Sequence, residues 1–339
     1  MFGIMEKKYS LGIDVSATSV KMILLMRQGT RRRLAASAHA ALPSGACRDG
    51  RIVDEKACGD AIKKAYTQLP HSRTNGETSI IASLPDVQTQ SAFITLPATT
   101  ITKEHVLAEA AKHIPIHTET MMIDWQTVGE KDGTASLVVM TALETTSNTL
   151  ANTLESAGCF PSVIENETAA LARLFAAKDA PQCIIDFGAS RTLLLSAKNE
   201  IPLFTLALPF TGVMLTDAIS QTLHLEREEA EATKRRCGLD TNACDGALRE
   251  IVNTHLVTTI QKIQMGLEEA ASSVGHTPET ITLAGGGAHC KAIDTVLSSA
   301  LAIPVTLGDC WLTVEKPAQF PHDQLAYAVA IGLALRGIT

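Results

Sequence analysis

Apolar runs separated by short turns of small residues give the most informative pattern in this chain. Residues 183–195 read CIIDFGASRTLLL, and residues 11–25 read LGIDVSATSVKMILL. In both stretches an apolar run ends in an aspartate, a turn of small residues follows, and a second apolar run returns. Small residues crowd a tight turn least, and two apolar runs around such a turn are typical of a β-hairpin. The sequence therefore predicts two strand–turn–strand units, which align on Asp14 and Asp186.

The two predicted turns carry the same chemistry. When they are aligned on their aspartates, Ala17 matches Ala189 and Thr18 matches Ser190. Each turn places one carboxylate beside hydroxyl and backbone N–H groups, which can hold phosphate while the aspartate holds a hydrated Mg²⁺. A hairpin turn without chemistry is the more common interpretation of either copy alone. The repetition favours two similar lobes with an anion between them, and a nucleotide is the natural candidate.

A glycine-rich segment follows the second unit at a distance. Residues 281–288 read ITLAGGGA, so a buried strand is expected to end in Gly285, Gly286 and Gly287, before a helix over Cys290–Leu301. Glycine lets the backbone pass close to a flat ligand, and a helix N-terminus favours negative charge. Two aspartate turns followed by such a segment form a far more specific pattern than any of them alone.

Hydrophobic periodicity predicts the elements between these motifs. In the first half the predicted elements are a helix over residues 54–69, a strand over 79–83, and a strand, helix, two strands and a helix over 91–96, 102–113, 121–128, 136–142 and 145–157. The last five form a compact α+β insert. The second half predicts a strand over residues 201–206 and helices over 213–223, 226–236, 245–274 and 324–335, the last of which packs back on the first lobe.

Composition limits the function classes. The 339 residues are 45% hydrophobic and 19% charged, which suits two domains of ordinary size. A net charge of −7 with few aromatic residues argues against a nucleic-acid surface. The eight cysteines contain no CxxC pair, which favours reduced thiols in a cytosolic protein. No apolar run approaches the ~20 residues that span a bilayer. We expect a cytoplasmic protein that contacts membranes only through partners or through the short segment Met1–Met5.

The three motifs, in this order, resemble the superfamily of actin, Hsp70 and the sugar kinases, two-lobed proteins that bind ATP. Residues 162–175, SVIENETAALARLF, resemble the NEPTAA-type segment of Hsp70-like and bacterial actin-like proteins. In those proteins the carboxylate near this position orients the water that attacks the γ-phosphate. The resemblance implies Glu167 for that catalytic role, with Glu165 as the second candidate.

Further segments narrow the resemblance to the PilM family, actin-like cytoplasmic proteins of type IV pilus assembly. They include IPLFTLALPFTGVMLTDAI, EEAEATKRRCGL and AYAVAIGLALR. The implied fold is α/β, a two-lobed actin-like (ribonuclease H-like) ATPase fold with the 1C subdomain that PilM shares with FtsA. The implied divisions are residues 1–85 (first lobe, 1A), 86–161 (inserted 1C subdomain), 162–182 (first lobe and interlobe connection), 183–224 (second lobe, 2A), 225–279 (helical 2B subdomain), 280–312 (adenosine segment) and 313–339 (return to the first lobe).

The resemblance also implies ligands and site residues. ATP with Mg²⁺ would bind between the lobes, with Asp14 and Asp186 beside the metal and phosphates. The other implied nucleotide contacts are Ser16, Ala17, Thr18, Ser19 and Lys21 (first loop), Gly188, Ala189 and Ser190 (second loop), Gly212, Glu231 and Lys234 (ribose or adenine side), and Gly285, Gly286 and Gly287 (adenosine). In the family, the N-terminal cytoplasmic tail of the membrane protein PilN docks in a groove between 1A and 1C. That contact, together with other pilus platform proteins, would place this chain at the inner membrane.

Two departures from the family pattern bear on activity. Relatives usually carry glycine at Ser16 and a Gly-Gly pair at Thr211–Gly212. A side chain at Ser16 in a positive-φ conformation would be strained, and Thr211 would reduce the room beside the nucleotide. We therefore expect ATP binding with slow or absent hydrolysis. An ATP-dependent sugar or metabolite kinase, and a nucleotide-free module of a type II secretion-like platform, remain alternatives. The oligomeric state, including a homo-oligomer, is left open.

Overall fold

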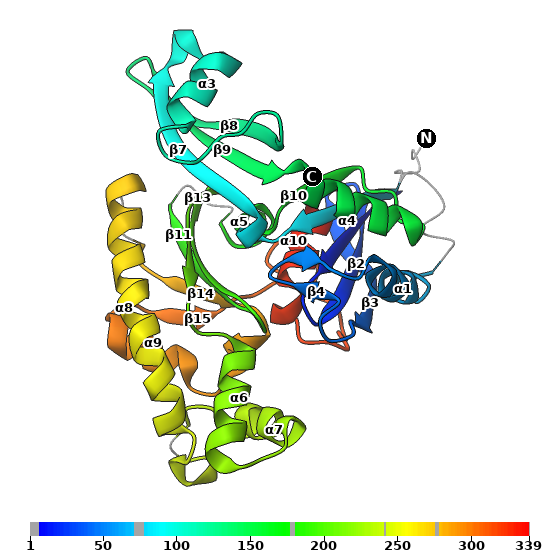
Figure 1. The fold of residues 1–339 in the computed structure, drawn as a ribbon, viewed down its shortest axis with the longest axis vertical. Helices are drawn as coiled ribbons and strands as arrows, with labels where there is room; N and C mark the ends of the chain where they lie inside the picture. Colours follow the sequence, from blue (N-terminus) through cyan, green and yellow to red (C-terminus); the bar gives the residue numbers. More distant parts are fainter. Residues whose placement is uncertain (1–6, 71–77, 177–179, 241, 275–277, 339) are drawn as a thin grey trace.

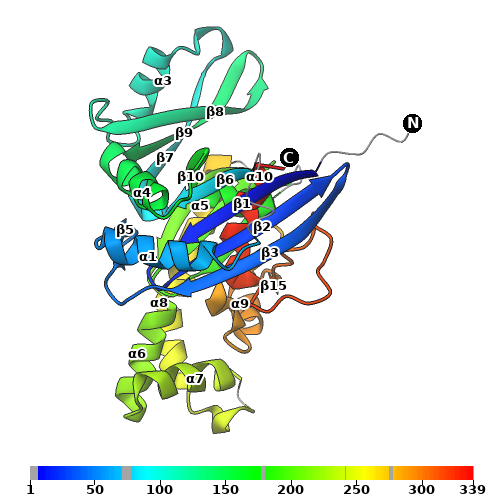
Figure 2. The same cartoon turned by 90° about the vertical axis from the view of Figure 1, so that its right-hand side faces the viewer.

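Two five-stranded sheets and a smaller three-stranded sheet organise the molecule (Figures 1 and 2). The computed structural model describes residues 7–70, 78–176, 180–240, 242–274 and 278–338. The segment Met1–Met5 lies outside these residues. Within the described part of the chain, no helix is both long and apolar enough to cross a membrane.

The first lobe is built on the first predicted hairpin. Its strands, in spatial order, are β10 (Val163–Asn166), β6 (Thr78–Leu84), β1 (Lys7–Val15), β2 (Ser19–Gln28) and β3 (Arg31–Ala41). β1 and β2 pair antiparallel with Asp14 opposite Lys21, while β6 and β10 add in parallel. A short pair, β4 (Cys47–Arg48) and β5 (Arg51–Ile52), precedes helix α1 (Glu55–Tyr66). Asp54 caps α1 by accepting from the Ala57 N–H, as the sequence predicts.

The second lobe repeats this plan around the second predicted hairpin. Its strands, in spatial order, are β13 (Ile201–Leu208), β12 (Thr192–Lys198), β11 (Gln182–Phe187), β14 (Ile281–Ala284) and β15 (Val305–Leu307). β11 and β12 pair antiparallel, and β14 lies parallel to β11 with Ala284 beside Asp186. This register brings the glycine segment to the end of β11 that carries the aspartate. The helices of this lobe are α6 (Gly212–Leu223), α7 (Arg227–Cys237), α8 (Arg249–Val274) and α9 (Ile293–Leu301).

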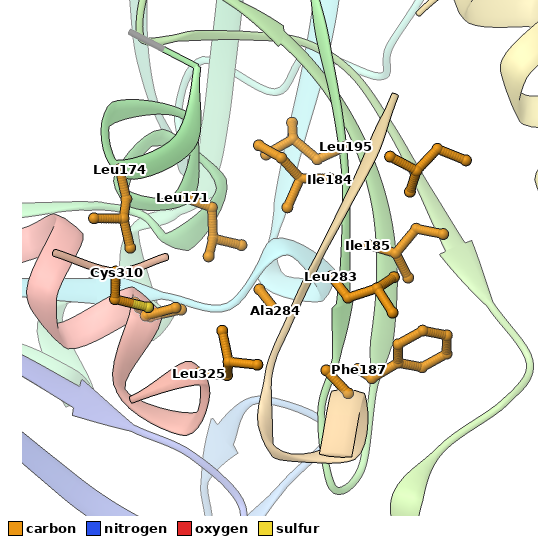
Figure 3. Close-up of a cluster of buried hydrophobic side chains, with 14 of the residues drawn as sticks. Leu171, Leu174, Ile184, Ile185, Phe187, Leu195, Leu283, Ala284, Cys310 and Leu325 are labelled. Atoms are coloured by element: carbon orange, nitrogen blue, oxygen red, sulfur yellow. The ribbon is translucent and has the colours of Figure 1, made fainter. Parts of the chain in front are cut away.

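Two helices separate the sheets. α5 (Glu167–Phe175) packs against β11, β12 and β13, and α10 (Ala328–Arg336) packs against α5 and the first-lobe strands β1, β2 and β6. Figure 3 shows Leu171 and Leu174 of α5 facing Ile184, whereas Ile185 and Phe187 point to the other side of the strand. Because successive side chains of a β-strand point to opposite faces, this sheet contributes apolar side chains to two layers, one on each face. The expectation that the last helix returns to the first lobe is confirmed.

The insert has its own core, but it is smaller than expected. β7 (Thr89–Pro97), β9 (Thr134–Leu143) and β8 (Met121–Lys131) form one antiparallel sheet, on which α3 (Lys103–Ala110) packs. Helix α4 (Glu144–Ser156), which we expected to complete the insert, instead buries Leu150 and Leu154 in the first-lobe core against α1. The insert and the α6–α7 pair lie at opposite ends of the long axis (Figures 1 and 2).

Two local predictions need correction. The helix expected over Cys290–Leu301 is present as α9 but begins three residues later, at Ile293, because residues Gly286–His289 form a 3₁₀ turn. The cysteines are not all reduced either, since Cys237 at the end of α7 forms a disulfide with Cys244.

The backbone of α10 lies very close to the backbone of α5. A Cβ added to Gly332 would lie 2.1 Å from the Ala170 backbone oxygen of α5. Replacing Gly332 by valine should therefore overpack this joint by about 3 kcal/mol and lower the melting temperature by about 4–5 °C. Gly129→Val is the matched control, because a Cβ at Gly129 meets nothing within 4 Å. Equal melting temperatures for the two variants in a thermal unfolding experiment would contradict the described packing.

Candidate functional site

Within the part of the chain that the structure describes, a large cavity lies between the lobes and is lined by every predicted site residue except Glu165. Its volume is about 1030 Å³, and its walls come from the two hairpin turns, the glycine turn and α7. The predicted residues that line it are Asp14, Ser16, Ala17, Thr18, Ser19, Lys21, Glu167, Asp186, Gly188, Ala189, Ser190, Gly212, Glu231, Lys234, Gly285, Gly286 and Gly287. Segments that are far apart in the sequence thus meet where the two hairpins face each other.

The two hairpin turns have the same backbone geometry. In the first turn the Ser16 N–H donates to the Ser19 oxygen at 2.9 Å, and in the second the Gly188 N–H donates to the Arg191 oxygen at 2.8 Å. Ser19 and Arg191 are therefore equivalent positions. The expectation that Ser16 is strained was wrong: its φ is not positive, and its hydroxyl donates to the same Ser19 oxygen at 3.0 Å. The serine reinforces the turn that glycine forms in the other lobe.

Thr211 also has a structural role that the sequence comparison did not suggest. It is the N-cap of α6, where its hydroxyl accepts from the Met214 N–H at 3.2 Å, and it is not part of the cavity wall. Gly212 is the residue that approaches the second turn, because its N–H donates to the Gly188 oxygen at 3.1 Å. The expected loss of room beside a ligand is therefore wrong.

The two aspartates differ in their surroundings. Asp14 accepts a hydrogen bond from the Lys21 ammonium at 3.0 Å, so the first turn carries its own ion pair. Burial raises the pKa of Asp186 to about 6, against the opposing positive charge of Arg191. Gly285 (φ +78°) is required beside it, since a Cβ there would lie 2.4 Å from Asp186 Oδ1. The glycine segment therefore packs directly on the carboxylate of the second turn.

Glu167, the catalytic candidate, has both carboxylate oxygens occupied. Oε1 accepts from the Asp86 N–H at 2.7 Å, and Oε2 accepts from the guanidinium of Arg191. Its side chain is only 5% exposed, and burial raises its pKa to about 7, with Arg191 opposing the shift. Both bonds stabilise the ionised carboxylate and so weaken Glu167 as an acceptor of a proton from water.

Glu165, the second candidate, does not reach the cavity. Arg173 pairs with it at 2.7 Å, and Arg336 donates to its other oxygen. It therefore ties α5 to α10, and the structure corrects its assignment as a water-positioning residue.

Glu231 and Lys234 form a bonded pair at the end of the cavity near α6. The Lys234 ammonium donates to Glu231 at 2.5 Å, to the Thr216 hydroxyl at 2.8 Å and to the Gly212 oxygen at 2.9 Å. Burial disfavours the charged form of Glu231, but the hydrogen bonds from Lys234, Thr216 and Arg235 outweigh it and hold its pKa at about 2. This pair presents a preformed polar wall on the α7 side.

Two sets of residues that line the cavity were not predicted from the sequence. Arg191 was overlooked because a cation in a hairpin turn is usually solvated, although its alignment with Ser19 would have singled it out. His39, His322 and Tyr327 also line the cavity, with the His322 and Tyr327 rings stacked at 4.8 Å. His39 comes from β3, far in the sequence from His322 and Tyr327, and no local pattern connects it to them.

The donor set fits a nucleotide with Mg²⁺ better than a metal alone. Within the described residues, no three histidine, cysteine, aspartate or glutamate side chains form a metal cluster. Two aspartates at facing turns nevertheless match the way Mg²⁺ is held, through one or two carboxylates together with waters and phosphates. The close approaches required at Gly188 and Gly285 leave backbone, rather than side chains, facing the cavity.

A smaller groove of about 210 Å³ lies beside the cavity. Its lining residues come from the first lobe and the start of α4; they are Val15, Cys47, Gly50, Arg51, Ile52, Ser83, Leu84, Pro85, Leu143, Thr145, Thr146, Thr149 and Leu150. Leu143 is the last residue of β9, so this groove lies where the insert joins the first lobe. Five residues, Val15, Cys47, Gly50, Ser83 and Pro85, line both the groove and the large cavity.

Comparison with known proteins gives one match to a family and several to folds. The family model described as "Type IV pilus assembly protein PilM" matches residues 12–338. A solved PilM–PilN type IV pilus biogenesis complex is similar with a TM-score of 0.79 and 24% identity over 97% of this chain and 98% of that chain. MreB5 of Spiroplasma citri bound to ADP has a TM-score of 0.58 and 13% identity (96% and 94% covered). EutJ of Carboxydothermus hydrogenoformans has a TM-score of 0.56 and 15% identity over 97% of this chain and 89% of that chain. The expected two-lobed actin-like fold is confirmed.

Proposed function

The chain belongs to the PilM family of type IV pilus assembly proteins, and from this premise we propose that it binds ATP between its lobes and docks the N-terminal tail of PilN. Docking on a membrane-anchored partner would hold it at the inner face of the membrane, where it would contact other pilus platform proteins. The family assignment favours this function over a metabolite kinase of the same superfamily.

One observation carries the nucleotide proposal. Both aspartate turns, the glycine turn and the Glu231–Lys234 pair line one cavity, although they are up to 270 residues apart in a chain of 339 residues. The hairpin turns would hold the phosphates, and the turn at Gly285 would lie along the adenosine. Mg²⁺, when bound, would supply positive charge to the phosphates. The protein's own contribution is to orient the nucleotide and to close it between two rigid sheets.

The groove beside the insert is the proposed docking site for the PilN tail. It has apolar walls from Val15 and Leu150, threonine side chains along α4, and Arg51 among its lining residues. A short peptide in a preformed groove orders few residues, so micromolar affinity, ~8 kcal/mol, does not require a large interface. Since α4 belongs to the first-lobe core, deleting residues 86–161 would damage the lobe and is not a suitable test.

Two binding measurements test the function as a whole. ATP with Mg²⁺ should bind the purified chain at equilibrium, and the same preparation should be captured by an immobilised N-terminal peptide of PilN. Binding of ATP without capture by the peptide would support the nucleotide site and contradict the assembly role. Capture without ATP binding would support the nucleotide-free alternative.

Hydrolysis is expected to be slow or absent, because Glu167 is only 5% exposed and its Oε1 is held by the Asp86 N–H. Phosphate release by the wild type should stay close to the buffer blank, and Glu167→Ala should lower any remaining turnover while ATP still binds. A wild-type rate of about 1 s⁻¹ or more, in the range of ordinary enzymes, would contradict this expectation. If turnover is measurable and Glu167→Ala leaves it unchanged, Glu167 does not position the water.

A further inference from the structure

Arg191 is the feature in which the two hairpin turns differ most. It occupies the position of Ser19 in a turn with the same backbone hydrogen bond. The first hairpin has its cation, Lys21, two residues further along and bonded to Asp14 at 3.0 Å. At the place that matches Lys21 in sequence, the second hairpin has Leu193, which is buried. The second turn therefore carries its cation at Arg191 instead.

Arg191 is largely buried and is paired with a carboxylate, so its positive charge is held in place. Its guanidinium donates to Glu167 across the boundary between the lobes, and its side chain is only 24% exposed. Asp14, Asp186 and Glu167 all line the same cavity as Arg191. The positive charge of Arg191 acts on Asp186 and on Asp86, where it opposes the rise in pKa that burial causes. Removing it would take from Glu167 its paired cation and would leave Lys21, which is bonded to Asp14, as the other cation that acts on Asp186.

These contacts bear on how a triphosphate is accepted. A polyanion that enters this region meets carboxylates, so it requires positive charge placed among them. In most phosphate sites a divalent ion supplies much of that charge, whereas a guanidinium can supply it with a fixed fork of donors that matches phosphate oxygens. Arg191 is attached to the turn that is proposed to hold the phosphates, so moving from Glu167 to a phosphate requires only side-chain rotation.

We propose that Arg191 is the resident cation of the phosphate region, which contacts the phosphates of ATP directly and makes ATP binding largely independent of Mg²⁺. This inference rests on the proposed nucleotide function and concerns the same cavity. It also assigns a second state to the Glu167 pair: Arg191 bonds Glu167 in the empty cavity and leaves it when a nucleotide binds.

The test compares ATP dissociation constants in Mg²⁺ and in EDTA by isothermal titration. For the wild type, removing Mg²⁺ should weaken binding by less than about fivefold. For Arg191→Gln it should weaken binding by about fiftyfold or more, since Glu167 then loses its paired cation and Lys21, the other cation that acts on Asp186, is bonded to Asp14. Arg191→Lys keeps the charge and should restore most of the metal independence, and it remains informative if Arg191→Gln folds poorly. Arg227→Gln is the matched control, because it removes the same charge from a side chain that is 63% exposed and does not line the cavity.

The outcomes separate the inference from the function on which it rests. Strong and equal metal dependence in the wild type and in Arg191→Gln would overturn the role of Arg191 while leaving the nucleotide site intact. The same metal dependence in Arg191→Gln and Arg227→Gln would attribute the effect to net charge and would also overturn it. Absence of ATP binding by the wild type in both buffers would overturn the nucleotide proposal itself, and the inference with it.

Discussion

Asp186→Ala should lose the thermal stabilisation that ATP with Mg²⁺ gives the wild type. At a concentration of a hundred times the dissociation constant, a ligand that binds only the folded state stabilises it by about 2.7 kcal/mol, which corresponds to about 5 °C for a chain of this size. Asp186 lies at the mouth of the second turn and packs against Gly285, so it touches two of the three segments that line the proposed phosphate region. Its loss should reduce the shift to less than about 1 °C.

The same substitution should leave the fold intact. Burial already raises the pKa of Asp186 to about 6, so the ionised carboxylate is destabilising in the empty protein, and alanine removes that cost. We therefore expect a melting temperature without nucleotide at least equal to that of the wild type at pH 8. Asp217→Ala is the control, because this half-exposed aspartate of α6 pairs with Arg227 at 3.5 Å, does not line the cavity and should retain the full ATP shift. An undiminished shift in Asp186→Ala would contradict the site.

The sequence predicted the hairpins and the cavity residues because those features depend on local pattern. An apolar run, an aspartate and a turn of small residues determine a strand, its end and its reversal, and the repeat places two such ends face to face. Strain at Ser16 could not be judged in the same way. It depends on the φ angle that the turn adopts, and here the serine hydroxyl bonds Ser19 in a turn that needs no positive φ.

Contacts between distant segments account for the other differences. The amphipathic stripe of α4 shows that Leu150 and Leu154 are buried, but not that their partner is α1 rather than the insert. The disulfide joins cysteines seven positions apart, whose Cα atoms lie 5.7 Å apart only because the chain bends after α7. Arg191 interacts electrostatically with carboxylates from three other segments, Asp14, Asp86 and Glu167. No local pattern in the sequence links these residues to it.

Filling the groove should prevent docking of the PilN tail. Thr145 is exposed at the start of α4 and lines the groove, so a tryptophan there would occupy space that the peptide needs without disturbing the core. We expect Thr145→Trp to weaken peptide binding by at least about tenfold, a loss of about 1.4 kcal/mol or more. Asn148→Trp introduces the same side chain on the same helix at an exposed position outside the groove, and it should bind as the wild type does.

The most direct measurement is a fluorescence-anisotropy titration of a labelled N-terminal peptide of PilN with the full-length chain and these two variants. Saturable binding with a micromolar dissociation constant, weakened at least about tenfold by Thr145→Trp and unchanged by Asn148→Trp, is the predicted result. Equal affinity for all three proteins would place the docking site elsewhere. No saturation of the wild type at about 1 mM would contradict its role as the docking partner of PilN.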